Sequence, residues 1–278
     1  MIKNTFREQV LFSTILIKST NDKGDIVGKG TGFLIQAQLS NTPDSSLVLL
    51  VSNKHVLETS KSIAINYHRS DAERNPVLGS FITRNIGDIS DVYYPHPDPS
   101  IDLACVNLSA DYDSMYPDIH GKPIKTELLS TFDDNLLNIG QRLYYVGYPE
   151  GRFDITNNLP IMRTGSIASH PRVEYNGKPQ FLIDSNVFKG SSGSPVFINV
   201  RDVALSDGLQ VQDVYESLLI GVITETMTYR NKVVSAYSVR DQDEQFVEEI
   251  LGIGLVYKST VLLDLINTTV ESFENSAS

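Results

Sequence analysis

Cysteine is almost absent from this sequence of 278 residues, which holds only Cys105. One cysteine excludes an internal disulfide, the covalent link on which small secreted domains depend. The sequence also lacks any run of about 20 apolar residues, the length that spans a bilayer, and so predicts no membrane partner. Basic residues are scarcer than acidic ones, 23 against 34, and the net charge of −11 argues against nucleic acid as a partner.

The N-terminal stretch allows a signal peptide as an alternative, because Lys3 and Arg7 precede the apolar segment Val10–Ile17. That segment is interrupted by Ser13 and Thr14, and no small-x-small cleavage site follows it. Together with the single cysteine, these features predict a cytoplasmic protein in a reducing compartment.

Short strand-like runs, separated by turn residues, make up most of the chain. They are Phe12–Lys18, Ile26–Gln36, Leu47–Ser52, Ile63–Tyr67, Ile101–Leu108, Leu143–Val146, Gly165–Ser169, Phe181–Ile183, Pro195–Val200, Leu218–Thr224 and Val233–Val239. No regular succession of amphipathic helices separates them, so they predict an antiparallel sandwich or barrel. One helix is expected after a capping Ser259 or Thr260, where apolar residues recur at helical spacing. Two polar stretches, Arg201–Glu216 and Arg230–Val247, are expected to be surface insertions.

A glycine-rich turn, Gly190-Ser191-Ser192-Gly193-Ser194-Pro195, runs directly into an expected strand. A serine between glycines lets a substrate carbonyl approach closely, and such a turn can point two N–H groups at one atom. Acyl transfer needs these two features, an exposed nucleophile and an oxyanion hole. On its own, the motif is more often a flexible surface turn.

Two further segments carry residues that could assist a nucleophile. His55 follows the apolar strand and the pair Ser52-Asn53, which can cap a helical turn and hold the imidazole on a rigid support. Asp102 alternates with the apolar residues of its expected strand, where a carboxylate is costly unless it has a partner. An imidazole N–H would be such a partner and would fix the tautomer of His55. Cys105 points to the opposite face and is interpreted as part of the core.

The order His55, Asp102, Ser192 along the chain is that of the chymotrypsin-type fold. An α/β-hydrolase is excluded, because its nucleophile precedes its histidine and all five histidines of this chain precede Ser192. Its Gly-x-Ser-x-Gly motif also fails here, since Ser194 occupies the position of the final glycine.

On these residues the chain resembles a trypsin-like serine protease, closest in style to bacterial HtrA-type peptidase domains. No PDZ module is expected, because only residues 259–278 follow Lys258. Six segments carry the resemblance in the family's order: Gly30–Ile35, Gly140–Pro149, Thr164–Ser169, Ile183–Gly193, Leu219–Val222 and Gly254–Tyr257.

The resemblance has departures that affect specificity and activation. Ser191 replaces the aspartate of the digestive enzymes, so activation by a freed N-terminus is not expected. Ser194 replaces the family's usual second glycine, as in glutamyl endopeptidases. However, Ile223 stands where those enzymes carry the histidine that recognises glutamate. Asn186 stands where trypsin has the aspartate at the floor of its pocket. The predicted substrate pocket, which favours a neutral side chain, is bordered by Asn186, Val187, Thr224, Glu225 and Thr226.

The resemblance implies an all-β fold of two antiparallel six-stranded β-barrels with a C-terminal α-helix. We expect an N-terminal barrel in residues 1–113, a linker in 114–127, a C-terminal barrel in 128–258, and a helix and tail in 259–278.

The implied activity is that of a serine endopeptidase, a hydrolase with the catalytic triad His55, Asp102 and Ser192. The N–H groups of Gly190 and Ser192 are expected to form the oxyanion hole. The alternative is a catalytically silent or partner-activated module on a protease fold, since fold alone does not give function. We expect no cofactor and no metal, because His96 and Asp98 alone fall short of a ligand set. The expected partners are a protein or peptide substrate and a possible regulatory protein.

Overall fold

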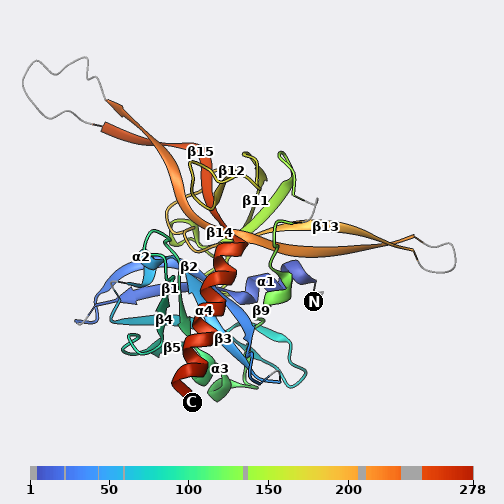
Figure 1. Ribbon diagram of the computed structural model, residues 1–278. Helices are drawn as coiled ribbons and strands as arrows, with labels where there is room; N and C mark the ends of the chain where they lie inside the picture. Colours follow the sequence, from blue (N-terminus) through green and yellow to red (C-terminus); the bar gives the residue numbers. More distant parts are fainter. Residues whose placement is uncertain are drawn as a thin grey trace, which may run out of the picture.

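The computed structural model describes residues 5–21, 23–42, 44–58, 60–133, 137–205, 211–232 and 246–277. Its strands fall into two groups, one in each half of the chain (Figure 1). The expected strand Val233–Val239 lies outside the described residues. Within the described ranges, no helix combines the length and the apolar character needed to cross a membrane.

The first half forms a nine-stranded sheet in which the path of hydrogen-bonded neighbours is β5-β4-β1-β2-β3-β7-β6. Two short strands join it from the side, β8 on β4 and β9 on β2. The strands are β1 Thr14–Thr20, β2 Ile26–Gln38, β3 Ser46–Ser52, β4 Ser62–Ser70, β5 Pro76–Ile86, β6 Tyr93–Pro95, β7 Ala104–Asn107, β8 Ile119–His120 and β9 Ile124–Lys125. β1 pairs antiparallel with β2, so the first two strands form a hairpin.

The second half forms a closed barrel with the strand order β10-β11-β12-β15-β14-β13. Its strands are β10 Arg142–Gly147, β11 Ile161–Ile167, β12 Gln180–Asp184, β13 Pro195–Leu205, β14 Val211–Lys232 and β15 Phe246–Lys258. β14 extends beyond the barrel at both ends and forms one ribbon with β13 and another with β15 (Figure 1). The two polar stretches that we expected to be insertions contribute the outer parts of these ribbons, where the structure describes them.

Four α-helices and two short 3-10 turns accompany the strands in the described chain. α1 is Phe6–Ser13, α2 is Lys54–Leu57, α3 is Ser109–Met115 and α4 is Ser259–Ala277, with 3-10 turns at Thr126–Leu128 and Pro149–Gly151. The predicted C-terminal helix is confirmed as α4, which begins at Ser259 and buries the apolar residues Val261, Leu262, Leu265, Ile266 and Val270.

Three hydrophobic cores hold the molecule together. One core is formed by residues of the first half, and another fills the closed barrel. The third, the shared core, combines residues of both halves with α4, for example Phe33 and Val51 from the first half and Tyr144 and Val222 from the second. The Cys105 side chain is fully buried in the shared core, and burial raises the pKa of its thiol to about 12. This confirms the interpretation of Cys105 as a core residue.

The chymotrypsin-like fold class is confirmed. The structure differs from the prediction in the first half, whose strands form a sheet and not a closed barrel, in the number of strands and in one helix. The first half has nine strands rather than six, because β6, β8 and β9, each only two or three residues long, add to six longer strands. Phe12 belongs to α1 rather than to a strand. This helix starts with a capping box, in which Thr5 and Glu8 each bond to the other's backbone N–H, a signal that favours a helix.

Candidate active site

Ser192 lies in the predicted turn, immediately before β13. Gly190 and Gly193 flank the serine pair, and both have φ at +86°, a conformation that favours glycine. The turn is pressed against the first half of the molecule, because the carbonyl of Ser192 accepts a hydrogen bond from the N–H of Thr31 at 3.1 Å. The Thr31 hydroxyl also donates to the carbonyl of Gly190 at 2.7 Å.

Gly193 leaves no space for a side chain. An added Cβ would lie 1.9 Å from the carbonyl oxygen of Thr31 and 2.6 Å from Oγ of Ser52. Left-handed strain and overpacking each cost roughly 1–3 kcal/mol, so we expect Gly193→Ala to destabilise the fold by about 3 kcal/mol or more. Denaturant unfolding measures this. As a control, Gly140→Ala carries similar strain at φ +78°, with nothing within 4 Å of its Cβ, and should cost clearly less. Equal losses for the two variants would contradict the prediction.

His55 is carried by the short helix α2, which follows β3 as predicted. Asn53 occupies the N-cap position, but its side chain makes no capping hydrogen bond. Instead its Nδ2 donates to the backbone carbonyl of Asp102 at 2.7 Å, so this side chain ties the helix to the segment that carries the carboxylate. The expected side-chain cap is therefore not formed, and Oδ1 of Asn53, the atom that would accept the capping hydrogen bond, has no partner among the described residues.

Asp102 lies just before β7, which begins at Ala104, and not within the strand as expected. The carboxylate is half-buried and accepts two hydrogen bonds from His55, from the backbone N–H at 3.0 Å and from Nδ1 at 2.7 Å. The Thr224 hydroxyl donates to the same carboxylate at 3.4 Å. A carboxylate oxygen can only accept, so Nδ1 carries the proton and Nε2 of His55 is left as the acceptor.

The pKa of His55 is raised above its usual value of 6.5. The largest cause is the hydrogen bond to Asp102, and the negative charges of Asp102, Glu58 and Glu225 add to it, while partial burial acts in the opposite direction. An imidazole in this setting is a stronger base than a free one and is stabilised when it takes up a proton.

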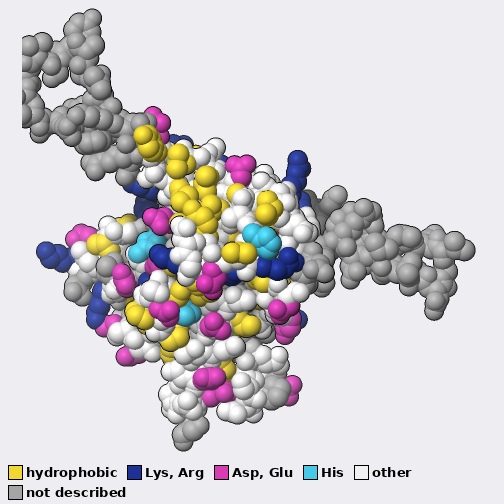
Figure 2. All heavy atoms as spheres, turned by 45° about the horizontal axis from the view of Figure 1, so that its top comes forward, with side chains coloured by type: hydrophobic (Ala, Val, Ile, Leu, Met, Phe, Trp, Pro, Cys, Tyr) yellow, Lys and Arg dark blue, Asp and Glu magenta, His cyan; other side chains and the backbone are white. Residues whose placement is uncertain are grey.

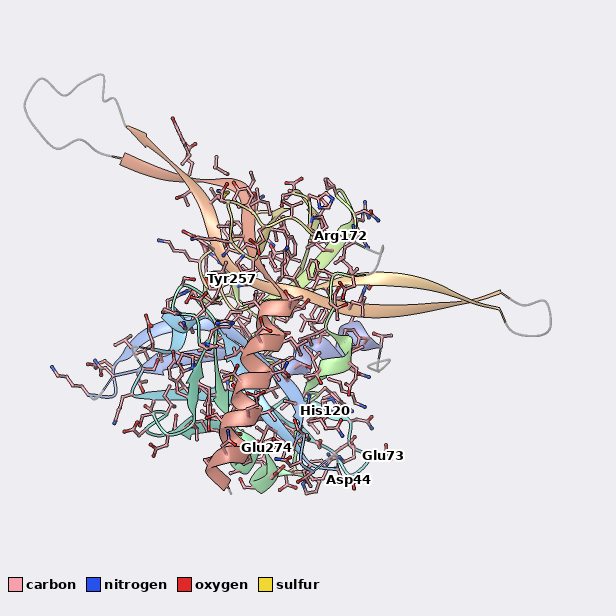
Figure 3. All side chains as sticks on the ribbon, viewed as in Figure 1. Asp44, Glu73, His120, Arg172, Tyr257 and Glu274 are labelled. Atoms are coloured by element: carbon pink, nitrogen blue, oxygen red, sulfur yellow. The ribbon has the colours of Figure 1, made fainter. Side chains whose placement is uncertain are left out.

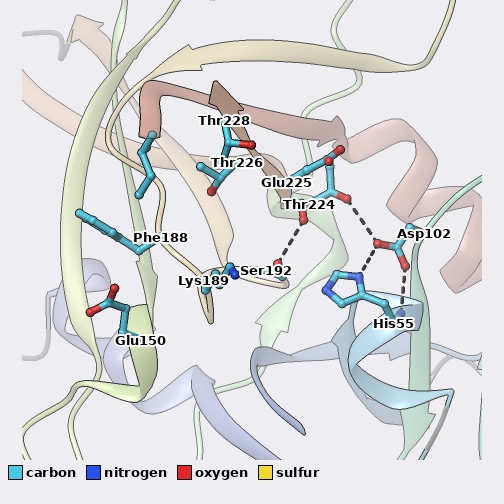
Figure 4. A pocket seen from close by; sticks show the side chains of 11 residues that line it. His55, Asp102, Glu150, Phe188, Lys189, Ser192, Thr224, Glu225, Thr226 and Thr228 are labelled. Carbon is cyan, nitrogen blue, oxygen red and sulfur yellow. Dashed lines mark hydrogen bonds and ion pairs between the residues drawn. The ribbon is translucent and has the colours of Figure 1, made fainter. Parts of the chain in front are cut away.

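The Ser192 hydroxyl donates to the backbone carbonyl of Thr224 at 3.1 Å, and not to the imidazole of His55 (Figure 4). The three predicted residues nonetheless line one cleft of about 640 Å³. Its lining residues in the described chain are His55, Asp102, Glu150, Phe188, Lys189, Ser192, Thr224, Glu225, Thr226, Thr228 and Ile250. Residues from both halves of the molecule therefore meet at the cleft.

The backbone N–H groups of the turn include the two that we expected to form the oxyanion hole, those of Gly190 and Ser192. The N–H groups of Ser191 and Gly193 donate to the carbonyls of Phe188 and Ile223. Those of Gly190 and Ser192 donate to no acceptor among the described residues. The two amides of the predicted oxyanion hole therefore have no hydrogen-bond acceptor within the described chain.

The predicted substrate pocket is brought together only in part. Thr224, Glu225 and Thr226 line the cleft. Val187 is buried in the barrel core, and Asn186 is exposed without being among the described lining residues. Tyr229, Ile250 and Leu251 on the β14–β15 ribbon have exposed apolar side chains, of which Ile250 lines the cleft. Figure 2 shows hydrophobic side chains gathered at the base of this ribbon.

Several residues of the site were missed by the sequence analysis. Phe188, Glu150 and Ile250 line the cleft, and the Tyr257 hydroxyl accepts a hydrogen bond from the backbone N–H of Asp102 at 3.2 Å. No motif marks these residues, because the fold of the barrel brings them near Ser192 and the packing of the two halves brings them near His55 and Asp102. The only available signal was that Phe188 lies two residues before the glycine-rich turn in the sequence, which could have indicated its place at the cleft.

A closed barrel packed on a second antiparallel sheet, with a His–Asp pair and a serine at one cleft, defines a protein of the chymotrypsin-like class. A family model described as "Trypsin-like peptidase domain" matches residues 30–203, which is more than half of the chain and includes all three predicted triad residues. The chain therefore belongs to the trypsin-like peptidase family, and the predicted resemblance is confirmed.

No curated protein sequence matches the chain. Solved structures that resemble it include the inactive form of Rv3671c from M. tuberculosis H37Rv, at 17% identity and TM-score 0.47, covering 96% of this chain and 91% of that one. The MamO protease domain from Magnetospirillum magneticum matches at 10% sequence identity with a TM-score of 0.47, and the match covers 93% of this chain and 97% of that one. An inactivated protease paralogue of the scabies mite, SMIPP-S-I1, matches at 13% sequence identity with a TM-score of 0.49, and the match covers 95% of this chain and 96% of that one.

Proposed function

We propose that this protein is a serine endopeptidase that hydrolyses peptide bonds through an acyl-enzyme. Oγ of Ser192 attacks the substrate carbonyl carbon while Nε2 of His55 takes the hydroxyl proton. His55 then returns this proton to the leaving nitrogen as the C–N bond breaks. Water, activated by the same imidazole, releases the acyl group and restores the serine. Asp102 holds the imidazole and stabilises its protonated form, and the N–H groups of Gly190 and Ser192 stabilise the oxyanion.

The observation that carries the proposal is the hydrogen-bonded pair of His55 and Asp102 at the cleft that also contains Ser192. These side chains come from α2, from the segment before β7 and from the turn before β13, so only the folded chain brings them to one place. The imidazole has its proton on Nδ1 and its acceptor nitrogen free, which is the state that a general base requires.

The strand β14 supplies a wall along which a substrate could lie. Its pairing with β13 ends at Val222, whereas its pairing with β15 continues to Lys232. The β13-facing edge of β14 is therefore without a strand partner from Thr224 onward in the described chain. Unpaired strand edges bind extended polypeptide by backbone hydrogen bonds, so this edge suits a peptide substrate.

Digestion of denatured casein, with mass spectrometry of the products, tests the proposed activity. We expect internal cleavage at neutral to mildly alkaline pH, mostly after neutral side chains, because the cleft has threonine and apolar walls and carries charges of both signs at Glu150, Lys189 and Glu225. Removal of residues only from the chain ends would contradict an endopeptidase. Cleavage mainly after Lys, Arg or Glu would contradict the predicted neutral preference.

The second candidate is a silent or partner-activated module, and one observation favours it. The Ser192 hydroxyl donates to the Thr224 carbonyl, so it must rotate before it can pass its proton to His55. A small fluorophosphonate, which needs only a competent nucleophile, separates the cases. Labelling of the purified protein supports the endopeptidase, labelling only after addition of cell lysate supports partner activation, and labelling under neither condition supports a silent module.

The cytoplasmic compartment predicted from the cysteine content is also part of the proposal. Fractionation of source cells tests it, and recovery of the protein outside the cytoplasmic fraction would contradict it.

A further inference from the structure

The backbone of Asp102 needs hydrogen-bond partners from outside the sheet. β7 begins two residues later, at Ala104, so the ladder that β7 forms with β3 does not reach Asp102. A buried backbone N–H or C=O without a partner costs free energy, and almost all such groups in folded proteins are paired. The partners of Asp102 therefore fix the backbone from which its carboxylate extends.

These partners come from the two halves of the molecule. The carbonyl of Asp102 accepts from Nδ2 of Asn53 at 2.7 Å and from the N–H of Lys54 at 3.4 Å, both in the segment that carries His55. The N–H of Asp102 donates to the hydroxyl of Tyr257 at 3.2 Å. Tyr257 belongs to β15 of the closed barrel, and in Figure 3 it lies where the barrel meets the first sheet.

Tyr257 is itself held firmly. Its side chain is only 4% exposed and packs in the shared core, with residues of both halves and α4 around it. Its strand is paired on both sides, with Gln180 of β12 and Val222 of β14 as its partners in register. Burial raises the pKa of the phenol above its usual value, so the hydroxyl is neutral and remains a fixed acceptor for the Asp102 amide.

We propose that Tyr257 is a positioning residue that sets the carboxylate of Asp102 against His55 from the barrel that carries Ser192. The proposal rests on the proposed function, since the role of the carboxylate is to orient the imidazole. His55 and Asp102 come from the first half and Ser192 from the second. The hydrogen bond from Asp102 to Tyr257 gives the His–Asp pair a fixed point on the half that carries the nucleophile.

The variant Tyr257→Phe removes only the hydroxyl and keeps the buried ring. Small misplacements in an active site can cost up to about a hundredfold in rate, and we expect roughly a tenfold lower kcat here, with KM changed less than about twofold. The pKa of His55 should also fall towards its usual value, because its largest cause is the hydrogen bond to Asp102. The acidic limb of the pH profile of kcat/KM should therefore move to lower pH.

Tyr144→Phe is the matched control. Tyr144 is 3% exposed, lies in the same shared core, and its hydroxyl donates to Oγ of Ser217 at 3.0 Å, far along β14 from the triad residues. Both variants lose a buried hydroxyl that takes part in hydrogen bonds, so both should lower the melting temperature. A purely structural role for Tyr257 predicts that the two variants have the same kcat and the same pH profile, and this result would overturn the proposal.

Titration of the His55 imidazole by NMR tests the proposal without any turnover. A lower pKa of His55 in Tyr257→Phe than in the wild type and in Tyr144→Phe supports the positioning role. An unchanged pKa overturns it. If the wild type shows no hydrolysis that depends on Ser192, the proposed function fails, and the titration still decides whether Tyr257 positions Asp102.

Discussion

Ser192→Ala is expected to abolish peptide hydrolysis and fluorophosphonate labelling. Loss of the nucleophile of a serine protease triad costs on the order of 10⁶ in kcat, because the remaining groups stabilise a transition state for which no attacking atom is present. The variant should fold normally, since Oγ makes a single hydrogen bond, to the Thr224 carbonyl, in a partly exposed turn. Initial rates with a peptide taken from a mapped casein site, together with labelling at one site, measure the effect.

Ser191→Ala is the control for this prediction. Ser191 is the neighbouring serine of the same turn, is 1% exposed, and its Oγ has no hydrogen-bond partner in the described chain. Removal of this hydroxyl should leave kcat within about twofold, since no catalytic contact and no hydrogen bond is lost. Equal labelling of the wild type and of Ser192→Ala, or a loss of activity in Ser191→Ala as large as in Ser192→Ala, would contradict the role of Ser192.

The strands could be predicted where local pattern and packing agree. The run Leu47–Ser52 is apolar and corresponds to β3, and Leu143–Val146 corresponds to β10. The strand β5, at Pro76–Ile86, was not predicted, because it pairs only with β4 among the longer strands and all of its side chains are exposed or half-buried. Strands at the rim of a sheet bury little apolar surface and leave a weak alternation in the sequence.

The candidate triad residues could be predicted better than the residues that line the cleft. His55 and Asp102 could be found because their neighbours in the sequence form a motif and a chain order that few folds share. The pocket residues depend on how strands from different parts of the barrel pack. Val187 was expected at the pocket because it follows Asn186, but its side chain is 1% exposed in the barrel core. Whether the Val187 side chain points into the cleft or into the core depends on the course of the backbone there, and no local sequence pattern indicates this.

The two halves of the molecule are joined at the candidate active site by hydrogen bonds as well as by the shared core. Thr31 of the first sheet binds the backbone at Gly190 and Ser192, and Thr224 and Tyr257 of the barrel bind Asp102. Each half thus helps to position the reacting group that the other half carries. A relative shift of the halves would separate the serine from the imidazole, so we expect the proposed catalysis to depend on an intact interface.

Asp102→Asn is expected to lower kcat/KM by about 10⁴ near neutral pH, because an amide in place of the carboxylate favours the wrong tautomer of the imidazole and removes its charge partner. The wild type should show an acidic limb with its midpoint above 6.5, since His55 must be neutral to act as a base and its pKa is raised. Activity therefore rises as the pH increases through the pKa of His55. In Asp102→Asn the midpoint should move to lower pH, because the hydrogen bond and charge that raise this pKa are lost.

Asp98→Asn separates this effect from a general change of charge. The Asp98 carboxylate accepts hydrogen bonds from Ser100, at 2.8 Å from its backbone N–H, and is not among the groups that raise the pKa of His55. This variant has the same charge change four residues away and should keep both the rate and the midpoint of the acidic limb. If Asp102→Asn and Asp98→Asn gave the same midpoint, or if Asp102→Asn retained wild-type kcat/KM, the carboxylate of Asp102 would not be the group that makes His55 a base.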